Sequence, residues 1–129
     1  MTVVTEETAQ LAEWEGPVRR IDKPWGYEIV FGVTERYCGK ILFVRAGEEL
    51  SLQYHRMKDE TIYLHEGDAE IVLATPGSPR TRARISPGRS FHVPPRTVHR
   101  LHAFEDSLFL EVSTPELDDV VRIEDRYGR

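Results

Sequence analysis

The sequence predicts an all-β, single-domain protein folded as a small jelly-roll barrel. Short runs rich in β-branched and aromatic residues alternate with turn residues along most of the chain. Turn sequences such as Glu66-Gly67-Asp68 and Pro87-Gly88 separate these runs. The length of 129 residues fits one hydrophobic core. Closing the strands into a barrel or jelly roll removes exposed sheet edges, which favours that arrangement over an open sheet.

The expected elements follow in chain order. An acidic N-terminal segment predicts a short helix at 6–14, which Gly16 and Pro17 end. Strands are expected, because turn residues separate these runs, at 27–33, 37–44, 50–55, 61–66, 69–74, 80–85, 90–93, 99–103 and 107–112. A last short strand is expected at 120–123. We therefore divide the chain into an N-terminal arm (1–22), a barrel (23–114) and a C-terminal tail (115–129) that packs on the barrel.

Composition narrows the class of protein. Apolar residues make up 40% of the chain and charged residues 30%, as in ordinary soluble domains. The net charge of −5 argues against a general nucleic-acid or anionic-membrane surface. The single Cys38 cannot form an intramolecular disulfide, which favours a reducing compartment. Since the sequence also shows no signal-like or membrane-spanning apolar run, we expect a cytoplasmic protein without nucleic-acid or membrane partners.

Four side chains form a metal-ligand pattern. Gln53 and His55 lie on one face of a strand, because strand side chains alternate between faces. Glu60 begins the next strand, and His99 belongs to a distant strand that reaches the others only if the sheet folds back on itself. Two imidazoles, a carboxylate and an amide oxygen make a mixed site for a divalent first-row metal. Zn is the expected ion, with Mn, Co, Ni and Fe as alternatives.

The spacing of these residues resembles the two cupin motifs. The positions that match are Gly47, Gln53, His55, Glu60 and Gly67 in the first motif, and Gly88, Pro94 and His99 in the second. Gln53 stands in place of the first His, Arg96 in place of a Gly, and Ala103 in place of an Asn. The Arg96 position is a turn at which Gly usually supplies a positive φ. The resemblance implies a cupin, a small double-stranded β-helix with the metal inside.

A narrower resemblance covers most of the chain from Lys23 onward. The segments that carry it are Lys23-Pro24-Trp25-Gly26, 39–44, 50–56, 90–94, 113–121 and 124–129. They are similar to the C-terminal isomerase domain of type II mannose-6-phosphate isomerases. In that family the domain often follows a mannose-1-phosphate guanylyltransferase domain, for which 129 residues are too few. The resemblance implies a metal-dependent sugar-phosphate isomerase.

Three residues are candidates for the catalytic base of such a reaction: Lys40, His92 and Glu111. Lys40 lies in an apolar strand, where an ammonium group needs a buried partner or a substrate oxygen or phosphate. His92 qualifies as a substrate contact only if it faces the cavity. The other basic residues near the ligand segments are Arg45, Arg56, Lys58 and Arg100, and most of them are expected on the solvated exterior.

The resemblance implies that the metal holds adjacent oxygens of an open-chain aldose while a base removes the proton α to the carbonyl. The resulting enediol is reprotonated at the neighbouring carbon. Two alternatives stay open: a non-catalytic metal-containing cupin that binds a sugar or small acid, and another cupin enzyme such as an oxygenase or epimerase. We also expect a homodimer, because closed two-fold dimers are the commonest oligomers, with Trp14, Trp25 and Phe31 contributing to the shared surface.

Overall fold

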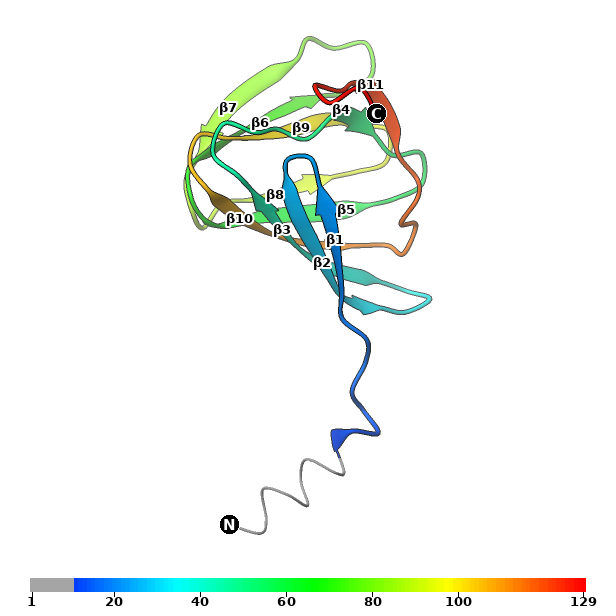
Figure 1. Ribbon diagram of the computed structural model, residues 1–129. Coiled ribbons are helices and arrows are strands. Elements are labelled where there is room, and N and C mark those ends of the chain that lie inside the picture. Colours follow the sequence, from blue (N-terminus) through cyan, green and yellow to red (C-terminus); the bar gives the residue numbers. More distant parts are fainter. Residues whose placement is uncertain (1–10) are drawn as a thin grey trace.

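The structure is a computed structural model that describes residues 11–129, so most of the helix expected at 6–14 lies outside the described residues. Within residues 11–129 the elements are eleven β-strands (Figure 1). Their bounds are β1 (Arg19–Lys23), β2 (Gly26–Val33), β3 (Cys38–Val44), β4 (Leu52–Tyr54), β5 (Glu60–Glu66), β6 (Ala69–Ala74), β7 (Thr81–Ile85), β8 (Ser90–Val93), β9 (Val98–Ala103), β10 (Ser107–Ser113) and β11 (Val121–Glu124). The all-β prediction is therefore confirmed. No helix among the described residues is long and apolar enough to span a membrane.

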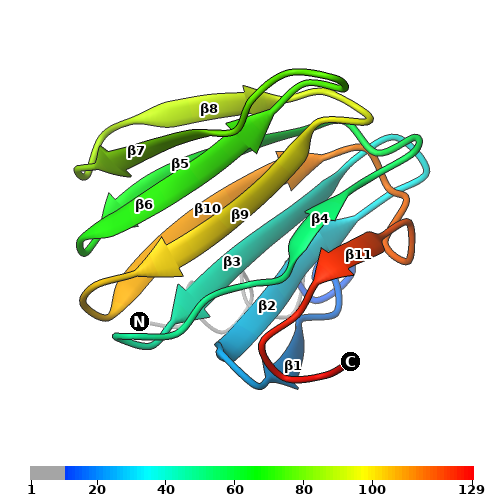
Figure 2. The same ribbon diagram turned by 90° about the horizontal axis from the view of Figure 1, so that it is seen from above.

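The strands form two antiparallel sheets that face each other (Figure 2). One sheet has the order β1-β2-β3-β10-β5-β8, and the other has the order β11-β4-β9-β6-β7. The chain crosses between the sheets repeatedly, so strands distant in sequence become neighbours. In this way β9 returns to pair with β4, and Gln53 lies opposite His99. This jelly-roll arrangement brings the strand of His99 beside the strand of Gln53, as the predicted ligand pattern required.

The inward side chains are polar at one end of the barrel and apolar at the other. On β3 the buried Lys40 is followed by buried Leu42 and Val44. The same change occurs along β5, β9 and β10, where Glu60, His99 and Glu111 lie at the polar end. The apolar end is filled by the core cluster of Trp25, Leu42, Val44, Ile62, Leu64, Ala69, Ile71, Ile85, Val93, Leu101, Ala103 and Phe109. Each fully buried large apolar side chain stabilises the fold by about 1.5–3 kcal/mol. Because the apolar end supplies this stabilising core, the side chains of the polar end can line a cavity.

The first strand was not expected from the sequence. β1 lies inside the segment that we assigned to the N-terminal arm, and it pairs with β2 from Arg19 opposite Val30 to Lys23 opposite Gly26. Ile21 is the only aliphatic residue of β1, so the strand carries no alternating apolar pattern. Its position at the edge of the sheet explains why charged side chains are tolerated there. The sheet therefore begins at Arg19.

One residue expected at a dimer surface lies in the interior instead. Trp25 is only 3% exposed and belongs to the core cluster between the sheets, so its assignment to a shared surface is wrong. It precedes β2 at a point where the chain turns inward, and its large ring fills the space between the two sheets. Trp14 and Phe31, by contrast, are exposed.

Candidate metal centre

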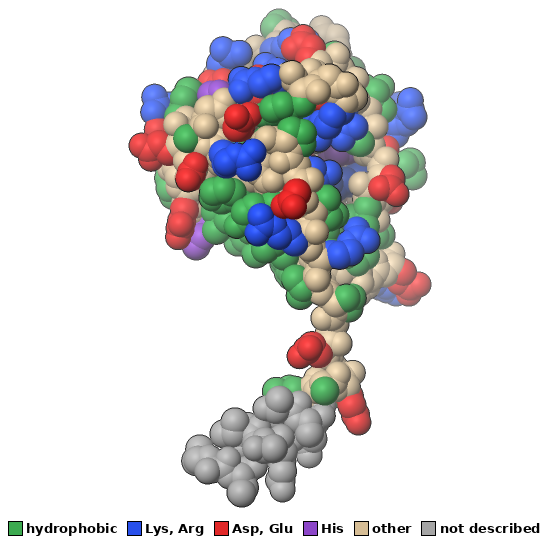
Figure 3. All heavy atoms as spheres, in the orientation of Figure 1, with side chains coloured by type: hydrophobic (Ala, Val, Ile, Leu, Met, Phe, Trp, Pro, Cys, Tyr) green, Lys and Arg blue, Asp and Glu red, His purple; other side chains and the backbone are tan. Residues whose placement is uncertain are grey.

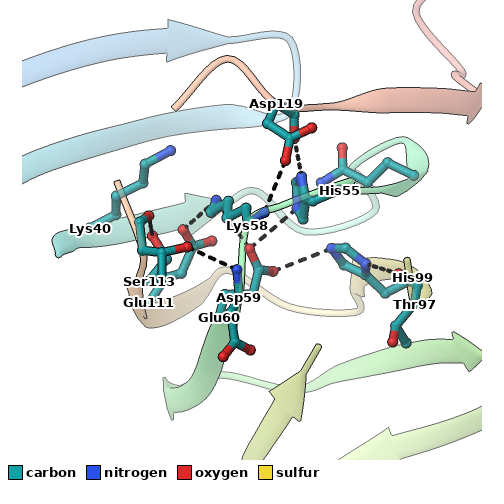
Figure 4. A network of polar contacts seen from close by, with 12 residues as sticks. Lys40, His55, Lys58, Asp59, Glu60, Thr97, His99, Glu111, Ser113 and Asp119 are labelled. Atoms are coloured by element: carbon teal, nitrogen blue, oxygen red, sulfur yellow. Dashed lines mark hydrogen bonds and ion pairs between the residues drawn. The ribbon is translucent and has the colours of Figure 1, made fainter. Parts of the chain in front are cut away.

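Three of the four predicted ligands meet inside the barrel. The side chains of His55, Glu60 and His99 are all buried, and their donor atoms lie within 4.8 Å of one another. The Glu60 carboxylate lies between the two rings, with Oε2 3.3 Å from His55 Nε2 and Oε1 3.3 Å from His99 Nε2 (Figure 4). Two imidazoles and one carboxylate on a common centre are a donor set suited to a divalent metal.

Hydrogen bonds fix which ring nitrogen of each His faces this centre. The Nδ1 of His99 lies 2.9 Å from the carbonyl oxygen of Thr97, and the Nδ1 of His55 contacts the carbonyl oxygen of Asp119. A carbonyl oxygen only accepts, so each Nδ1 donates and the Nε2 of each ring is the nitrogen that faces the centre. Both Nε2 atoms are buried and lack a hydrogen-bond partner among the described residues. Such orphaned buried nitrogens are rare in proteins, and a bound metal ion would satisfy both.

Gln53 lies beside these three residues. It is opposite His99 in the strand register and lines the same cavity as His55. Its side-chain oxygen accepts a hydrogen bond from the Ser51 hydroxyl at 2.7 Å. A carbonyl oxygen has a second lone pair, so this contact leaves one available for an ion.

Lys58 is a buried cation of the candidate site that the sequence analysis placed elsewhere. We expected it on the solvated exterior, but it is only 4% exposed, and its Nζ lies 3.0 Å from Glu60 Oε2 and 2.9 Å from Glu111 Oε2. Burial opposes its charged form, yet the charges of Glu111 and Glu60 outweigh burial and raise the pKa of Lys58. Lys58 belongs to the turn between His55 and Glu60, where strand alternation does not set the side-chain direction. The sequence signal that could have revealed its inward position is the pair of inward carboxylates, Glu60 and Glu111, which need a cation nearby.

The charge of Glu60 is maintained by its neighbours. Burial by itself raises the pKa of a carboxyl group, but the contacts with His55 and His99 and the charge of Lys58 outweigh it and hold the pKa of Glu60 well below its usual range. Glu60 is therefore ionised at neutral pH. An ionised carboxylate between two neutral imidazoles is the form in which these groups bind a metal.

The turn between His55 and Glu60 is held by two distant segments. The carboxylate of Asp119, in the C-terminal tail, accepts hydrogen bonds from the backbone N–H groups of Arg56, Met57 and Lys58. These hydrogen bonds hold the pKa of Asp119 at about 2, those from Met57 and Lys58 contributing more than that from Arg56. The backbone N–H of Arg96 donates to the carbonyl of His55 at 2.6 Å. Arg96 itself adopts the positive φ of 66° that the Gly of the cupin motif would supply, so the turn is retained without Gly.

Two of the three catalytic candidates line the cavity. Lys40 is 7% exposed, with its Nζ 3.6 Å from Glu28 Oε2, and it lies opposite Glu111 in the strand register. The third candidate, His92, does not face the cavity. Its side chain is 61% exposed and its Nε2 lies 2.7 Å from Asp59 Oδ1. The neighbouring Val93 takes the inward position on β8, and alternation turns His92 outward.

The cavity beside His55 has a volume of about 100 Å³, and its lining carries more basic than acidic side chains. Its charged lining consists of Lys23, Lys40, Lys58, Arg122 and Arg129 together with Glu28 and Glu111. Figure 3 shows basic side chains gathered around a hollow in the barrel surface. A local excess of positive charge in a chain of net charge −5 favours an anionic ligand at this place.

A family model described as "Mannose-6-phosphate isomerase C-terminal" matches residues 12–125 of this chain. Over 117 residues the chain is 32% identical to the mannose-1-phosphate guanylyltransferase ManC of Salmonella typhimurium strain LT2, and the match covers 86% of this chain and 23% of that protein. It is 31% identical over 117 residues to the xanthan biosynthesis protein XanB of Xanthomonas campestris pv. campestris strain ATCC 33913, covering 86% of this chain and 24% of XanB. This chain therefore spans about a quarter of the length of these relatives.

Solved structures with the same fold include two bacterial proteins. The capsular polysaccharide assembling protein CapF of Staphylococcus aureus superposes with a TM-score of 0.72 at 14% identity, over 84% of this chain and 35% of CapF. Oxalate decarboxylase of Bacillus subtilis superposes with a TM-score of 0.73 at 16% identity, over 82% of this chain and 30% of that enzyme. Another structure of the Bacillus enzyme is described by its Mn(II) centres. These likenesses confirm the predicted cupin fold.

Proposed function

Because this chain belongs to the mannose-6-phosphate isomerase C-terminal family, we propose that it is a metal-dependent isomerase that interconverts an aldose phosphate and the corresponding ketose phosphate. The observation that carries this proposal is the buried set of His55, Glu60 and His99 beside a basic cavity. The family description supports the reaction class, and the basic lining supports a phosphorylated substrate.

The metal would be held by the Nε2 atoms of His55 and His99 and by the carboxylate of Glu60, with the amide oxygen of Gln53 as a fourth ligand. When bound, a divalent ion supplies Lewis-acid polarisation of the substrate's carbonyl and hydroxyl oxygens. One carboxylate leaves the centre with a net positive charge, which suits that role. Zn is the proposed ion, and Mn, Co, Ni or Fe would fit the same donors.

Glu111 is the proposed base. Its carboxylate is 6% exposed, lines the cavity, and is joined to the ligand Glu60 through the Lys58 ammonium group, which contacts both. It would take the proton from the carbon next to the carbonyl and return it to the former carbonyl carbon, through an enediol. The proton of the neighbouring hydroxyl passes to the former carbonyl oxygen, so that aldose and ketose differ only in proton positions. A positioned base contributes about 10²–10⁴-fold to such a step.

Basic side chains in the cavity favour a sugar phosphate over a free sugar. Five cationic residues line the cavity against two acidic ones. Arg129 pairs with Asp125, whereas Arg122 on β11 forms no ion pair within residues 11–129. A phosphate group carries about two negative charges at neutral pH and prefers guanidinium partners. We propose that the phosphate end of the substrate binds on the β11 side, with the reacting carbons toward Glu111.

An isomerase assay on protein loaded separately with Zn, Mn, Co, Ni or Fe tests this function. Hexose phosphates, pentose phosphates and the free sugars are supplied as aldoses, and ketose formation is measured. We expect conversion of a sugar phosphate, and a loss of about 100-fold or more for Glu111→Gln with the ion retained. Glu66→Gln is the matched control, because that side chain is 73% exposed on the outside of the barrel.

A non-catalytic sugar-binding cupin is the second candidate function. It is favoured by the pairing of Glu111 with Lys58 and of Lys40 with Glu28, which leaves each candidate base already neutralised by a partner. If sugar phosphates bind but no ketose forms with any of the five metals, this reading replaces the isomerase.

A further inference from the structure

The two ligand histidines are oriented in different ways. His99 donates its Nδ1 proton to Thr97, two residues away in the sequence. His55 instead donates to the backbone carbonyl of Asp119, which is 64 residues away in the C-terminal tail. His99 is therefore oriented by its own segment, whereas the orientation of His55 depends on a separate part of the chain.

Asp119 contacts the ligand segment from both its backbone and its side chain. While its carbonyl accepts from the His55 ring, its carboxylate accepts from the next three backbone N–H groups, those of residues 56–58, at distances of 3.0, 2.7 and 2.9 Å. Three successive N–H groups directed at one carboxylate fix the backbone of the turn that leads from His55 to Glu60. This turn also carries Lys58 into the barrel, where it contacts Glu60.

We propose that Asp119 is the positioning residue of the metal centre, setting the ring orientation and tautomer of His55 and the course of the turn that places Lys58. Outer partners of metal-ligating histidines commonly act in this way, and losing one lowers metal affinity by about 10–100-fold. The side chain matters because it attaches the carbonyl of the same residue to the turn. Without the carboxylate, the carbonyl is no longer held against the ring.

We expect the tail to stay docked when Asp119 is changed, because other contacts hold it. On one side Thr114 donates its backbone N–H to Asp59 at 3.0 Å. On the other side β11 pairs with β4, and Tyr127 packs against the core cluster and contacts Glu48. The N–H groups of Arg56 and Met57 lie on exposed residues, where water can replace the lost carboxylate. The effect of substitution is therefore expected at the metal centre more than on global stability.

Metal affinity and the His55 tautomer together test this inference. Zn binding to Asp119→Ala, Asp119→Asn and the unchanged protein is measured by competition with a chromophoric chelator. We expect a 10–100-fold weaker affinity for Asp119→Ala, and partial recovery in Asp119→Asn because an amide oxygen still accepts N–H groups. Imidazole nitrogen NMR on the metal-free protein should show His55 as a mixture of tautomers in Asp119→Ala, while His99 keeps its proton on Nδ1.

Two control variants separate positioning from loss of the fold. Asp118→Ala removes a neighbouring exposed carboxylate and should change neither measurement. Tyr127→Phe weakens the tail at its far end and should lower the melting temperature without altering His55. The inference is overturned if Asp119→Ala binds Zn as tightly as the unchanged protein, if its His55 tautomer is unaltered, or if Tyr127→Phe changes His55 equally. The inference rests on the metal site of the proposed function but not on turnover. An inactive protein that binds Zn refutes the isomerase alone. If the unchanged protein binds no Zn, the NMR comparison still decides the role of Asp119.

Discussion

Replacing Lys58 with Met should destabilise the metal-free protein more than the metal-bound protein. Lys58 is 4% exposed and contacts two buried carboxylates, Glu60 at 3.0 Å and Glu111 at 2.9 Å. Met fills a similar volume without the charge, so the substitution leaves two carboxylates buried and without a cation. Removing one partner of a buried ion pair costs about 3–5 kcal/mol. We therefore expect the free energy of unfolding of metal-free Lys58→Met to fall by about that amount.

A bound divalent ion should reverse part of this loss, because it supplies a cation to Glu60. Binding stabilises both proteins, so only a difference in affinity changes the loss. In Lys58→Met the ion no longer shares Glu60 with an ammonium group, and each tenfold gain in affinity adds about 1.4 kcal/mol. A tenfold gain would therefore reduce the loss relative to the unchanged protein to about 1.6–3.6 kcal/mol when both are saturated with Zn.

Urea unfolding with EDTA and with saturating Zn measures both quantities. Lys23→Met is the control, because the Lys23 side chain is 27% exposed and its Nζ lies 4.0 Å from Glu28 Oε1. Such a partly exposed pair contributes about 0–1 kcal/mol, with or without the ion. A loss of less than about 1 kcal/mol in metal-free Lys58→Met, or a loss that Zn leaves unchanged, would refute the reasoning.

Three further predictions concern other parts of the molecule. Arg96→Gly should raise the free energy of unfolding by about 0.5–1 kcal/mol, because Gly adopts the φ of 66° without strain; an unchanged midpoint in urea would contradict this. His99→Ala should abolish Zn retention and turnover together, whereas Lys40→Ala should keep Zn, as measured by elemental analysis, while activity falls about 100-fold. Phe31 and Val112 are 50% and 59% exposed on neighbouring parts of one sheet, so Phe31→Asp with Val112→Asp should convert a dimer into a monomer by light scattering; a monomeric unchanged protein would reject this surface.

The strands and the meeting of three candidate ligands could be predicted from the sequence because both depend on alternation. Period-two patterning places Glu60 and His99 on the inward face and directs the chain into short antiparallel strands. The same rule, applied around Val93, would have turned His92 outward. Lys58 could not be placed in this way, because it lies in a turn whose course is fixed by Asp119 from the tail. Long-range hydrogen bonds of this kind leave no periodic signal.

The first strand escaped prediction for a different reason. Arg19, Arg20, Asp22 and Lys23 surround a single Ile, so β1 is held by backbone pairing to β2 rather than by an apolar face. Arg20 also lies over the Tyr27 ring, 3.9 Å from its centroid, which covers part of the strand pair. An edge strand of this composition becomes visible only when its partner strand is known.

The central claim is that His55, Glu60 and His99 hold a divalent ion. X-ray absorption spectroscopy of the Zn-loaded protein tests it most directly, with His99→Ala measured alongside. The account predicts imidazole scattering from two rings at about 2.0–2.1 Å and oxygen ligands at about 2.0–2.2 Å, with one ring lost and the ion released or weakly held in His99→Ala. A Zn shell without imidazole, or a shell that is the same in both proteins, would contradict the account.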